Sequence, residues 1–275
     1  GPALAIGGPA VQGLGFYNAY YVLQDGKVSA RVLKHHLPNE TVFDEVRIFD
    51  VGPMSGPYTV NGLRIGSPIC EDAWHADVCE TLQESGAQIL LVPNGSPYYR
   101  GKHETRLNHM VGRVVETELP LIYLNMVGGQ DDQVFDGGSF ALNAHGALAH
   151  QMGVFDEEMR VVELADTGEG WKIVKGDMVS LPCAWEQDYR CMVEGLRDYM
   201  GKTGFKKVLL GLSGGVDSAI VATIAVDALG AENVRCVMLP SEYTSQASLK
   251  DAKDIATRLG CHYDIVPIKA GRDAV

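Results

Sequence analysis

The sequence lacks the features that mark membrane, secreted and small disulfide-linked proteins. No apolar run approaches the ~18 residues of a membrane-spanning helix, and no basic start followed by a long apolar stretch indicates a secretion signal. The six cysteines are scattered without a CxxC pair, so neither a zinc site nor a disulfide framework is indicated. These absences predict a cytoplasmic protein with free thiols.

Positive charge is also in short supply. The chain has 23 Lys and Arg against 35 Asp and Glu, a net charge of −12 over 275 residues. Proteins that bind nucleic acid through its phosphates normally present a basic face. The charge balance therefore argues against a nucleic-acid partner, and the missing apolar runs argue against a membrane one. A hydrophobic fraction of 46% with 21% charged residues is typical of a folded chain, not a disordered one.

Apolar strands and amphipathic helices alternate along residues 1–154, which we expect to form one domain. A turn at 24–27 links two predicted strands over 16–23 and 28–33, and residues 3–7 predict another strand. Short apolar runs predict strands at 87–93 and 119–126. Between them, apolar residues spaced three or four apart over 107–115 predict a helix, and a further helix is expected over 75–86. Short links between strands and helices are typical of a layered α/β domain.

A change of composition divides the chain after this first domain. Residues 155–187 are rich in acidic and turn-forming residues, which predicts a connector. Beyond it, residues 188–275 are expected to form a second α/β domain. Its first helix is expected to begin with Asp188 as N-cap, and strands and helices then alternate in the order βαβαβ. This order is typical of part of a doubly wound parallel sheet.

A glycine-rich segment links the first strand and helix of that βαβαβ unit. Amide groups at a helix start carry partial positive charge and attract phosphate, glycines permit close approach of a ligand, and a carboxylate is a hard ligand for Mg²⁺. The Walker pattern GxxxxGK[ST] is absent. An ordinary strand–helix turn, with the aspartate as a cap, is the alternative interpretation. The segment comprises Ser213, Gly214, Gly215, Val216, Asp217 and Ser218.

This segment resembles the SGGxDS loop of the ATP pyrophosphatases, or PP-loop enzymes, which cleave ATP between the α- and β-phosphates. The resemblance implies that residues 213–218 bind ATP and that Asp217 is a ligand of Mg²⁺. It also implies a fold like that of the adenine nucleotide α-hydrolases for the second domain.

A cysteine at a predicted strand end is the second candidate site. Cys70 follows the strand at 63–69 and precedes a helix, where nearby cations and amide groups can activate a thiol. From this placement alone, Cys70 is either a nucleophile or a buried structural cysteine. Upstream, His35 and His36 stand side by side. Adjacent residues on a strand point to opposite faces, so the pair does not predict a metal site.

Three segments around these residues resemble the nitrilase, or carbon–nitrogen hydrolase, superfamily. Lys34 stands in a K-x-H-L setting, and Cys70 stands in an I-C-E-D-x-W setting. Residues 92–102 resemble the glutamine-binding segment in the glutaminase domain of glutamine-dependent NAD⁺ synthetases. The resemblance implies a layered α-β-β-α fold for the first domain. It also implies a nucleophilic Cys70, with Lys34 stabilising the oxyanion.

The resemblance extends to further residues, among them the F-D-G-G-S-F segment at 135–140, and to the order of the two domains. It implies that Glu45 orients the lysine and that Glu71, Ser96 and Lys102 hold glutamine. A nitrilase domain followed by an SGGxDS domain implies a ligase of NAD biosynthesis. Such an enzyme uses ATP and Mg²⁺ to amidate deamido-NAD⁺ to NAD⁺ with ammonia from glutamine. Members of this family commonly form homo-oligomers, which we expect here too.

The sequence departs from the family at two points. No glutamate precedes Glu40, whereas the general-base glutamate of the family lies before the lysine; Glu40 itself stands where relatives often carry an aromatic residue. A complete synthetase domain also needs strands beyond Val275. We therefore expect the middle of a longer protein, without complete activity of its own. Three alternatives stay open: a stand-alone thiol amidase or nitrilase with a regulatory nucleotide-binding unit, a tRNA-modifying PP-loop enzyme, and an inactive binding module.

Overall fold

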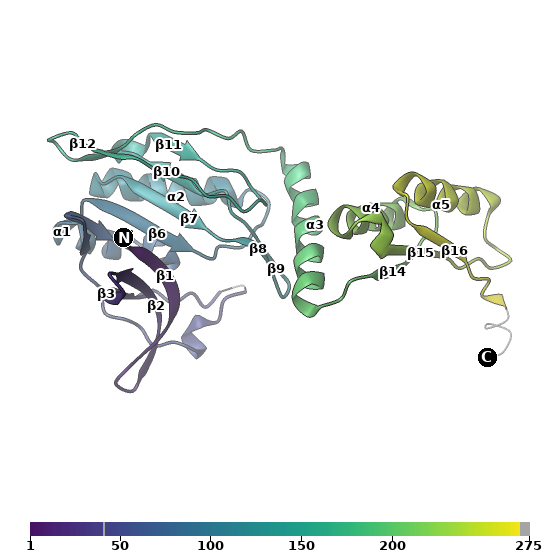
Figure 1. The fold of residues 1–275 in the computed structure, drawn as a ribbon, viewed down its shortest axis with the longest axis horizontal. Helices are drawn as coiled ribbons and strands as arrows, with labels where there is room; N and C mark the ends of the chain where they lie inside the picture. The colour runs from purple at the N-terminus through teal and green to yellow at the C-terminus, as the bar shows by residue number, and fades with distance from the viewer. Residues whose placement is uncertain (41, 270–275) are drawn as a thin grey trace. The chain divides into compact units, whose positions relative to one another are not determined.

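The computed structural model describes residues 1–40 and 42–269, and the chain folds as two compact units (Figure 1). Unit 1 comprises residues 1–127 and 135–181, and unit 2 comprises residues 128–134 together with the chain from 182 onward. Within the described residues, no helix has the length and apolar character needed to cross a bilayer.

A mixed six-stranded sheet is the centre of unit 1. Its two middle pairs, β5–β6 and β6–β7, are parallel, and the outer pairs are antiparallel. Strands were predicted at 87–93 and 119–126, and both predictions are confirmed with bounds shifted by one or two residues. In sheet order the strands are β11 (Leu148–Gln151), β10 (Phe140–Leu142), β7 (Leu121–Asn125), β6 (Ile89–Asn94), β5 (Leu63–Gly66) and β4 (Tyr58–Val60).

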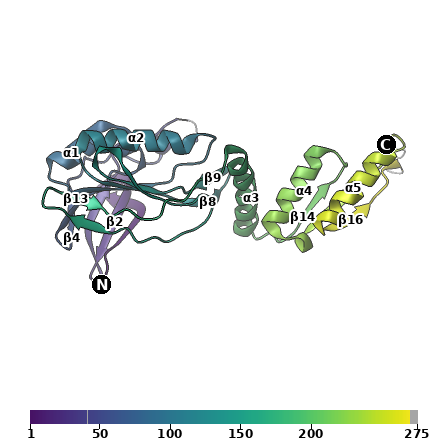
Figure 2. The same ribbon diagram turned by 90° about the horizontal axis from the view of Figure 1, so that it is seen from above.

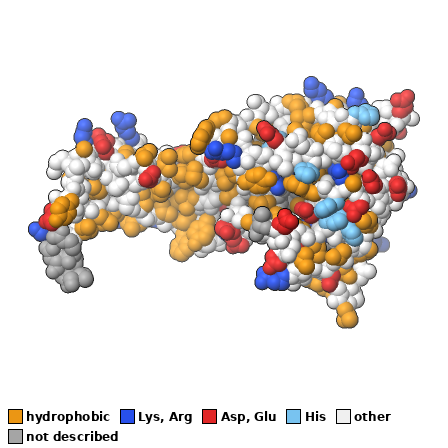
Figure 3. Space-filling view, turned by 180° about the vertical axis from the view of Figure 1, so that it is seen from behind, with side chains coloured by type: hydrophobic (Ala, Val, Ile, Leu, Met, Phe, Trp, Pro, Cys, Tyr) orange, Lys and Arg blue, Asp and Glu red, His pale blue; other side chains and the backbone are white. Residues whose placement is uncertain are grey.

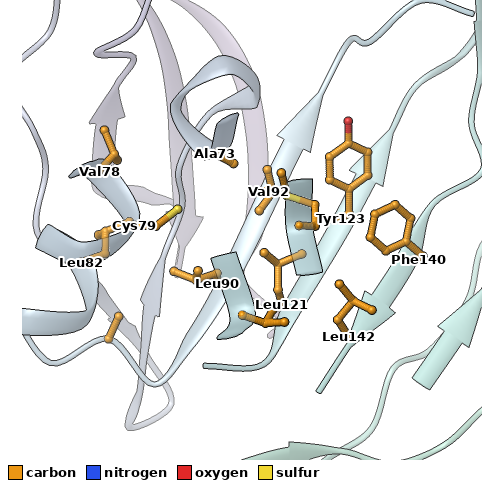
Figure 4. Close-up of a cluster of buried hydrophobic side chains, with 13 residues drawn as sticks. Ala73, Val78, Cys79, Leu82, Leu90, Val92, Leu121, Tyr123, Phe140 and Leu142 are labelled. Atoms are coloured by element: carbon orange, nitrogen blue, oxygen red, sulfur yellow. The ribbon is translucent and has the colours of Figure 1, made fainter. Parts of the chain in front are cut away.

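Two helices cover one face of this sheet (Figure 2). The predicted amphipathic stripe is confirmed as α2 (Lys102–Thr117), which buries Met110 and Val114 against the sheet. The helix expected over 75–86 is α1 (Ala76–Glu84), and a 3₁₀ turn, η2 (Cys70–Trp74), precedes it. Figure 4 shows the apolar core between these helices and strands β6, β7 and β10.

A three-stranded antiparallel sheet packs on the opposite face. Its strands are β1 (Leu4–Gln12), β2 (Gly15–Gln24) and β3 (Lys27–Leu33). The predicted turn between β2 and β3 is confirmed, with Asp25 and Gly26 both at positive φ, as a tight hairpin requires. The first strand was expected only over residues 3–7. Pairing with β2 extends it through Pro9, which the edge of a sheet tolerates.

These elements form three of the four layers expected of a nitrilase-like domain. Tyr20 and Val22 of the smaller sheet pack on Ile65 and Ile89 of the larger one, which gives the order helix, sheet, sheet. In the part of unit 1 that the structure describes, α1 and α2 are the two α-helices. The outer helical layer of the expected α-β-β-α fold is therefore not built from these residues.

The region between the expected domains contains regular structure. Residues 155–187 include the hairpin β12 (Leu164–Asp166) and β13 (Trp171–Ile173), and Ile173 is fully buried. The helix expected to begin after Asp188 begins earlier, as α3 (Ala184–Thr203), with Cys183 at the N-cap position. The N-cap prediction was wrong because Pro182 ends the extended segment sooner, and Glu186 supplies the acidic residue that a first turn favours.

Unit 2 has the predicted βαβαβ order. Its strands form a parallel sheet in the order β14-β15-β16, with a core of small and apolar residues beneath the two crossover helices. The hairpin of β8 (Val127–Gln130) and β9 (Gln133–Asp136) contacts α3, where the Gly129 amide donates to the Asp198 carboxylate at 2.7 Å. The remaining elements are β14 (Val208–Gly211), α4 (Val216–Leu229), β15 (Val234–Met238), α5 (Gln246–Leu259) and β16 (His262–Ile265).

Candidate functional site

Cys70 lies where the chain leaves β5 and turns into η2. Its φ of +49° is in the left-handed region, which non-glycine residues rarely adopt and which is common at reactive positions. The turn is held by Asp72, whose buried carboxylate accepts a hydrogen bond from the Ile69 amide at 3.0 Å. The thiol is therefore presented on a strained but well-supported turn.

The same carboxylate draws a distant segment to the turn. Asp72 Oδ1 also accepts the amides of His35 at 3.0 Å and His36 at 2.7 Å. Burial raises the pKa of Asp72, and these backbone hydrogen bonds oppose the rise. Asp72 thereby fixes the residues that follow Lys34 against the turn that carries Cys70. Asp72 was not among the residues predicted to form the site, although it lies within the I-C-E-D-x-W motif.

Lys34 and Glu45 form a close ion pair. The Lys34 side chain is 1% exposed, and its Nζ lies 2.8 Å from both carboxylate oxygens of Glu45, which is 18% exposed. Glu45 begins the 3₁₀ turn η1 (Glu45–Arg47). An almost fully buried ammonium needs such a partner to remain charged at this position. The contact places Glu45 beside the lysine, and its role in orienting Lys34 stays a prediction.

One pocket of about 560 Å³ brings most of the predicted residues together. Cys70, Glu71, Ser96 and Lys102 all line it, and Glu40 lines it too. The ammonium of Lys102 lies 4.4 Å from the ring centre of Trp74 and 4.7 Å from that of Tyr99, which are favourable cation–π distances. Lys34 and Glu45 are not among the residues that line the pocket.

The groups around the Cys70 thiol shift its pKa in opposite directions. Burial raises the pKa of Cys70, and the Lys34 cation lowers it. The Glu71 carboxylate raises it again, and a hydrogen bond from the Gly95 backbone lowers it. The balance leaves the Cys70 pKa above its ordinary value. Because thiolates are the reactive form, Lys34 is the group that favours reaction.

A buried hydrogen-bond network, which was not predicted from the sequence, holds Ser96 in place. The guanidinium of Arg106 is fully buried and binds both oxygens of Asp136 at 2.8 and 2.9 Å. It also donates to Ser96 Oγ at 3.1 Å and to the Ser96 carbonyl at 2.7 Å. Asn125 Oδ1 accepts the Ser96 amide at 2.9 Å. Asp136 lies in the F-D-G-G-S-F segment that resembles the family, so the motif was a usable signal.

The glycine loop of unit 2 forms the expected strand–loop–helix turn. Gly214 has φ +84°, and a Cβ there would lie 2.4 Å from the Ser248 carbonyl oxygen of α5. Its lack of a side chain is thus required by packing as well as by any ligand. Gly215 is the N-cap of α4, so Asp217 is not the cap. The Oγ atoms of Ser213 and Ser218 lie 3.1 Å apart.

The paired histidines differ from the expectation. We expected His35 and His36 to point to opposite faces of a strand, but β3 ends at Leu33, so strand alternation does not apply to them. Their ring centres are 4.8 Å apart, and each offers a ligand atom near Asp77.

Comparison with known proteins identifies the class that this fold and site define. The family described as carbon–nitrogen hydrolase matches residues 1–173, and the family described as NAD synthase matches residues 188–275. The chain belongs to the carbon–nitrogen hydrolase family.

Individual relatives match both units together. A glutamine-dependent NAD⁺ synthetase of Rhodobacter capsulatus is 58% identical over the whole chain, which covers 50% of that protein. One from Xanthomonas campestris pv. campestris is 41% identical over 98% of the chain and 49% of that protein. The structure of glutamine-dependent NAD⁺ synthetase from Acinetobacter baumannii, in complex with ADP, matches 99% of this chain and 52% of its own with a TM-score of 0.94 and 36% identity. The chain spans about half the length of the curated relatives it matches.

Proposed function

We propose that this chain carries the glutaminase site and part of the ATP site of a ligase. The ligase uses ammonia from glutamine to convert deamido-NAD⁺ into NAD⁺ at the expense of ATP. The observation that carries the proposal is the single pocket lined by Cys70, Glu71, Ser96 and Lys102. The 58% identity to the Rhodobacter capsulatus synthetase supports the same substrates.

In the proposed first reaction, the Cys70 thiolate attacks the side-chain amide carbon of glutamine. The developing oxyanion is stabilised by the cation of Lys34, which Glu45 holds in place. Ammonia leaves, and water hydrolyses the resulting thioester to glutamate. The thiol proton passes to the general-base glutamate that the family uses and from there to the departing nitrogen, which leaves as ammonia; residues 1–39 contain no glutamate.

The charges that line the pocket fit the two ends of an amino acid. Lys102, flanked by two aromatic rings, suits the α-carboxylate of glutamine. Glu71 suits the α-ammonium group. Ser96, which the guanidinium of Arg106 holds, offers a hydroxyl for a further hydrogen bond. We propose that these residues select an amide that carries an amino-acid group.

The second unit is proposed to bind ATP along residues 213–218. A pocket of about 510 Å³ adjoins the loop and is lined by Ser213, Met238, Thr244 and neighbouring residues. The Asp217 carboxylate is exposed in the first turn of α4 and accepts no hydrogen bond within residues 1–40 and 42–269. One free carboxylate beside a phosphate site fits Mg²⁺, which prefers oxygen ligands. Mg²⁺ would neutralise phosphate charge there.

In the proposed reaction, ATP activates the carboxylate that is to be amidated. A carboxylate is a poor acyl donor until it carries a good leaving group. Adenylation of the nicotinate carboxylate of deamido-NAD⁺ releases pyrophosphate, and ammonia then displaces AMP to form the amide. The homo-oligomer and the cytoplasmic location remain predictions.

Two variants, each made in the complete natural protein that contains this chain, test the two halves separately. Cys70→Ala is expected to abolish glutamine-dependent NAD⁺ formation and to leave formation from added ammonium unchanged. Asp217→Ala is expected to abolish NAD⁺ formation from both nitrogen sources and to leave glutamate release intact. The matched control is Cys183→Ala, which removes an exposed thiol outside the pocket. NAD⁺, glutamate, AMP and pyrophosphate are measured in each assay.

Two outcomes would contradict the proposal. Retention of glutamate release by Cys70→Ala would remove the assigned nucleophile. Glutamate release without any AMP or pyrophosphate in the presence of ATP and deamido-NAD⁺ would favour the alternative, a thiol amidase with a regulatory nucleotide-binding unit.

A further inference from the structure

A cluster of three ligand-type side chains lies beside the Cys70 pocket. His35, His36 and Asp77 each offer one ligand atom, and these atoms all lie within 4.8 Å of one another. His36 Nε2 is 2.9 and 3.0 Å from the two oxygens of Asp77. All three residues are partly exposed, so an ion can reach them. Figure 3 shows histidine and acidic side chains close together on one face of unit 1.

The backbone around the cluster holds both imidazoles in place. The amides of His35 and His36 both bind one oxygen of the buried Asp72. The ring of His36 also stacks on that of His75, with ring centres 4.0 Å apart. The backbone of both histidines and the ring of His36 are thus held in place, which lowers the entropic cost of binding an ion.

The imidazole of His35 has the tautomer that metal-binding histidines usually adopt. His35 Nδ1 lies 2.7 Å from the Gly52 carbonyl oxygen. A carbonyl can only accept, so Nδ1 carries the proton and Nε2 keeps its lone pair free. Metal-ligating histidines typically donate their second ring N–H to a backbone carbonyl or a carboxylate. This contact is a second observation, independent of the clustering, that points to a metal ligand.

We propose that His35, His36 and Asp77 bind a divalent transition-metal ion, with Zn²⁺ as the representative ion. Two imidazoles and one carboxylate favour zinc and its neighbours over Mg²⁺ or Ca²⁺, which prefer all-oxygen sites. The ion takes the place of the proton shared by His36 and Asp77, and water completes its coordination. This site is separate from the proposed Mg²⁺ site at Asp217.

Occupancy of the site has a structural consequence for unit 1. His35 directly follows Lys34, and Asp77 lies in the first turn of α1, seven residues after Cys70. A bound ion therefore tethers the segment that carries the lysine to the helix that follows the cysteine. We expect metal binding to raise the melting temperature of unit 1, because an ion that binds only the folded state stabilises it.

The test measures metal binding directly and does not depend on the proposed reaction. Protein stripped of metal with a chelator is titrated with Zn²⁺ in competition with a chromophoric chelator. We expect one Zn²⁺ per chain that is lost or weakened at least about tenfold in both His35→Gln and Asp77→Asn. The matched control is His145→Asn, which removes a histidine of unit 1 outside the cluster. Its φ of +65° is one that asparagine tolerates.

Two further measurements separate this site from the thiols and from misfolding. Co²⁺ is added in place of Zn²⁺, and its spectrum is expected to lack a thiolate charge-transfer band. The melting temperatures of the metal-free variants are compared with that of the parent to confirm folding. Unchanged Zn²⁺ affinity in both folded variants, or a thiolate band that accounts for all bound Co²⁺, would overturn the proposal.

Discussion

The ion pair of Lys34 and Glu45 gives a sharp test of how the candidate site is held together. The two side chains are not equally buried: Lys34 is 1% exposed and Glu45 is 18% exposed. Removing the negative partner leaves an ammonium in an almost dry site. Removing the positive partner leaves a carboxylate that can still reach water. The two single substitutions should therefore lower the free energy of unfolding by very different amounts.

The expected difference in destabilisation follows from the unequal burial of the two charges. Glu45→Gln removes the charge but keeps the shape, and leaving a buried charge unpaired costs about 3–5 kcal/mol. Partial exposure of the site reduces this figure, so we expect about 3 kcal/mol, or about a hundredfold in the unfolding equilibrium at roughly 1.4 kcal/mol per tenfold. Lys34→Met should cost less than about 1 kcal/mol, because methionine fills the space and Glu45 becomes hydrated.

The double variant completes the cycle. With both charges removed, Glu45→Gln no longer strands an ammonium, so the pair should cost much less than the sum of the singles. Unfolding of unit 1 can be followed through Cys79, a fully buried core thiol. Short pulses of iodoacetamide along a urea gradient, with peptide mass spectrometry, give the fraction in which Cys79 is accessible. A cost below about 0.5 kcal/mol for Glu45→Gln, or strictly additive costs, would refute the argument.

Three further predictions concern the thiol, the glycine loop and the buried network. Because the Lys34 cation lowers the pKa of the Cys70 thiol, Lys34→Met should move the pH profile of Cys70 alkylation to higher pH; a shift to lower pH would contradict this assignment. Gly214→Ala places a Cβ against the Ser248 carbonyl at positive φ and should destabilise unit 2 by roughly 1–3 kcal/mol, which thermal unfolding measures. Asp136→Asn leaves a fully buried guanidinium without its carboxylate and should destabilise unit 1 by about 3–5 kcal/mol, which the same pulse labelling would detect.

Much of the fold was predictable because it depends on local sequence. The apolar residues of α2 recur every three or four positions, which indicates a helix. The short apolar run of β6 indicates a buried strand. The predicted start of α3 was wrong by five residues, because a capping-type aspartate, Asp188, outweighed the effect of Pro182 in the prediction. The extent of β1 was wrong because pairing with β2 overrode the local preference of Gly7, Gly8 and Pro9.

The candidate residues of the site were easier to single out from the sequence than the groups that support them. Cys70 and Lys34 could be singled out because each stands in a short motif of recognisable residue types. Glu45 was expected beside Lys34 from the resemblance, but the supporting carboxylates Asp72 and Asp136 were not expected, because their partners are remote in sequence. Asp72 binds amides 36 and 37 residues away, and Asp136 binds a guanidinium 30 residues away. A buried charge in a motif has no visible partner until the chain is folded.

The histidine pair shows how a correct rule can fail at a boundary. Strand alternation would separate His35 from His36, but β3 ends at Leu33, and beyond that point Asp72 decides where the backbone goes. The same carboxylate that sets Lys34 beside the Cys70 turn thus also brings two imidazoles to Asp77. If Asp72 organises both features, Asp72→Asn should slow Cys70 alkylation and weaken Zn²⁺ binding together. A loss of one without the other would show that the two features are positioned independently.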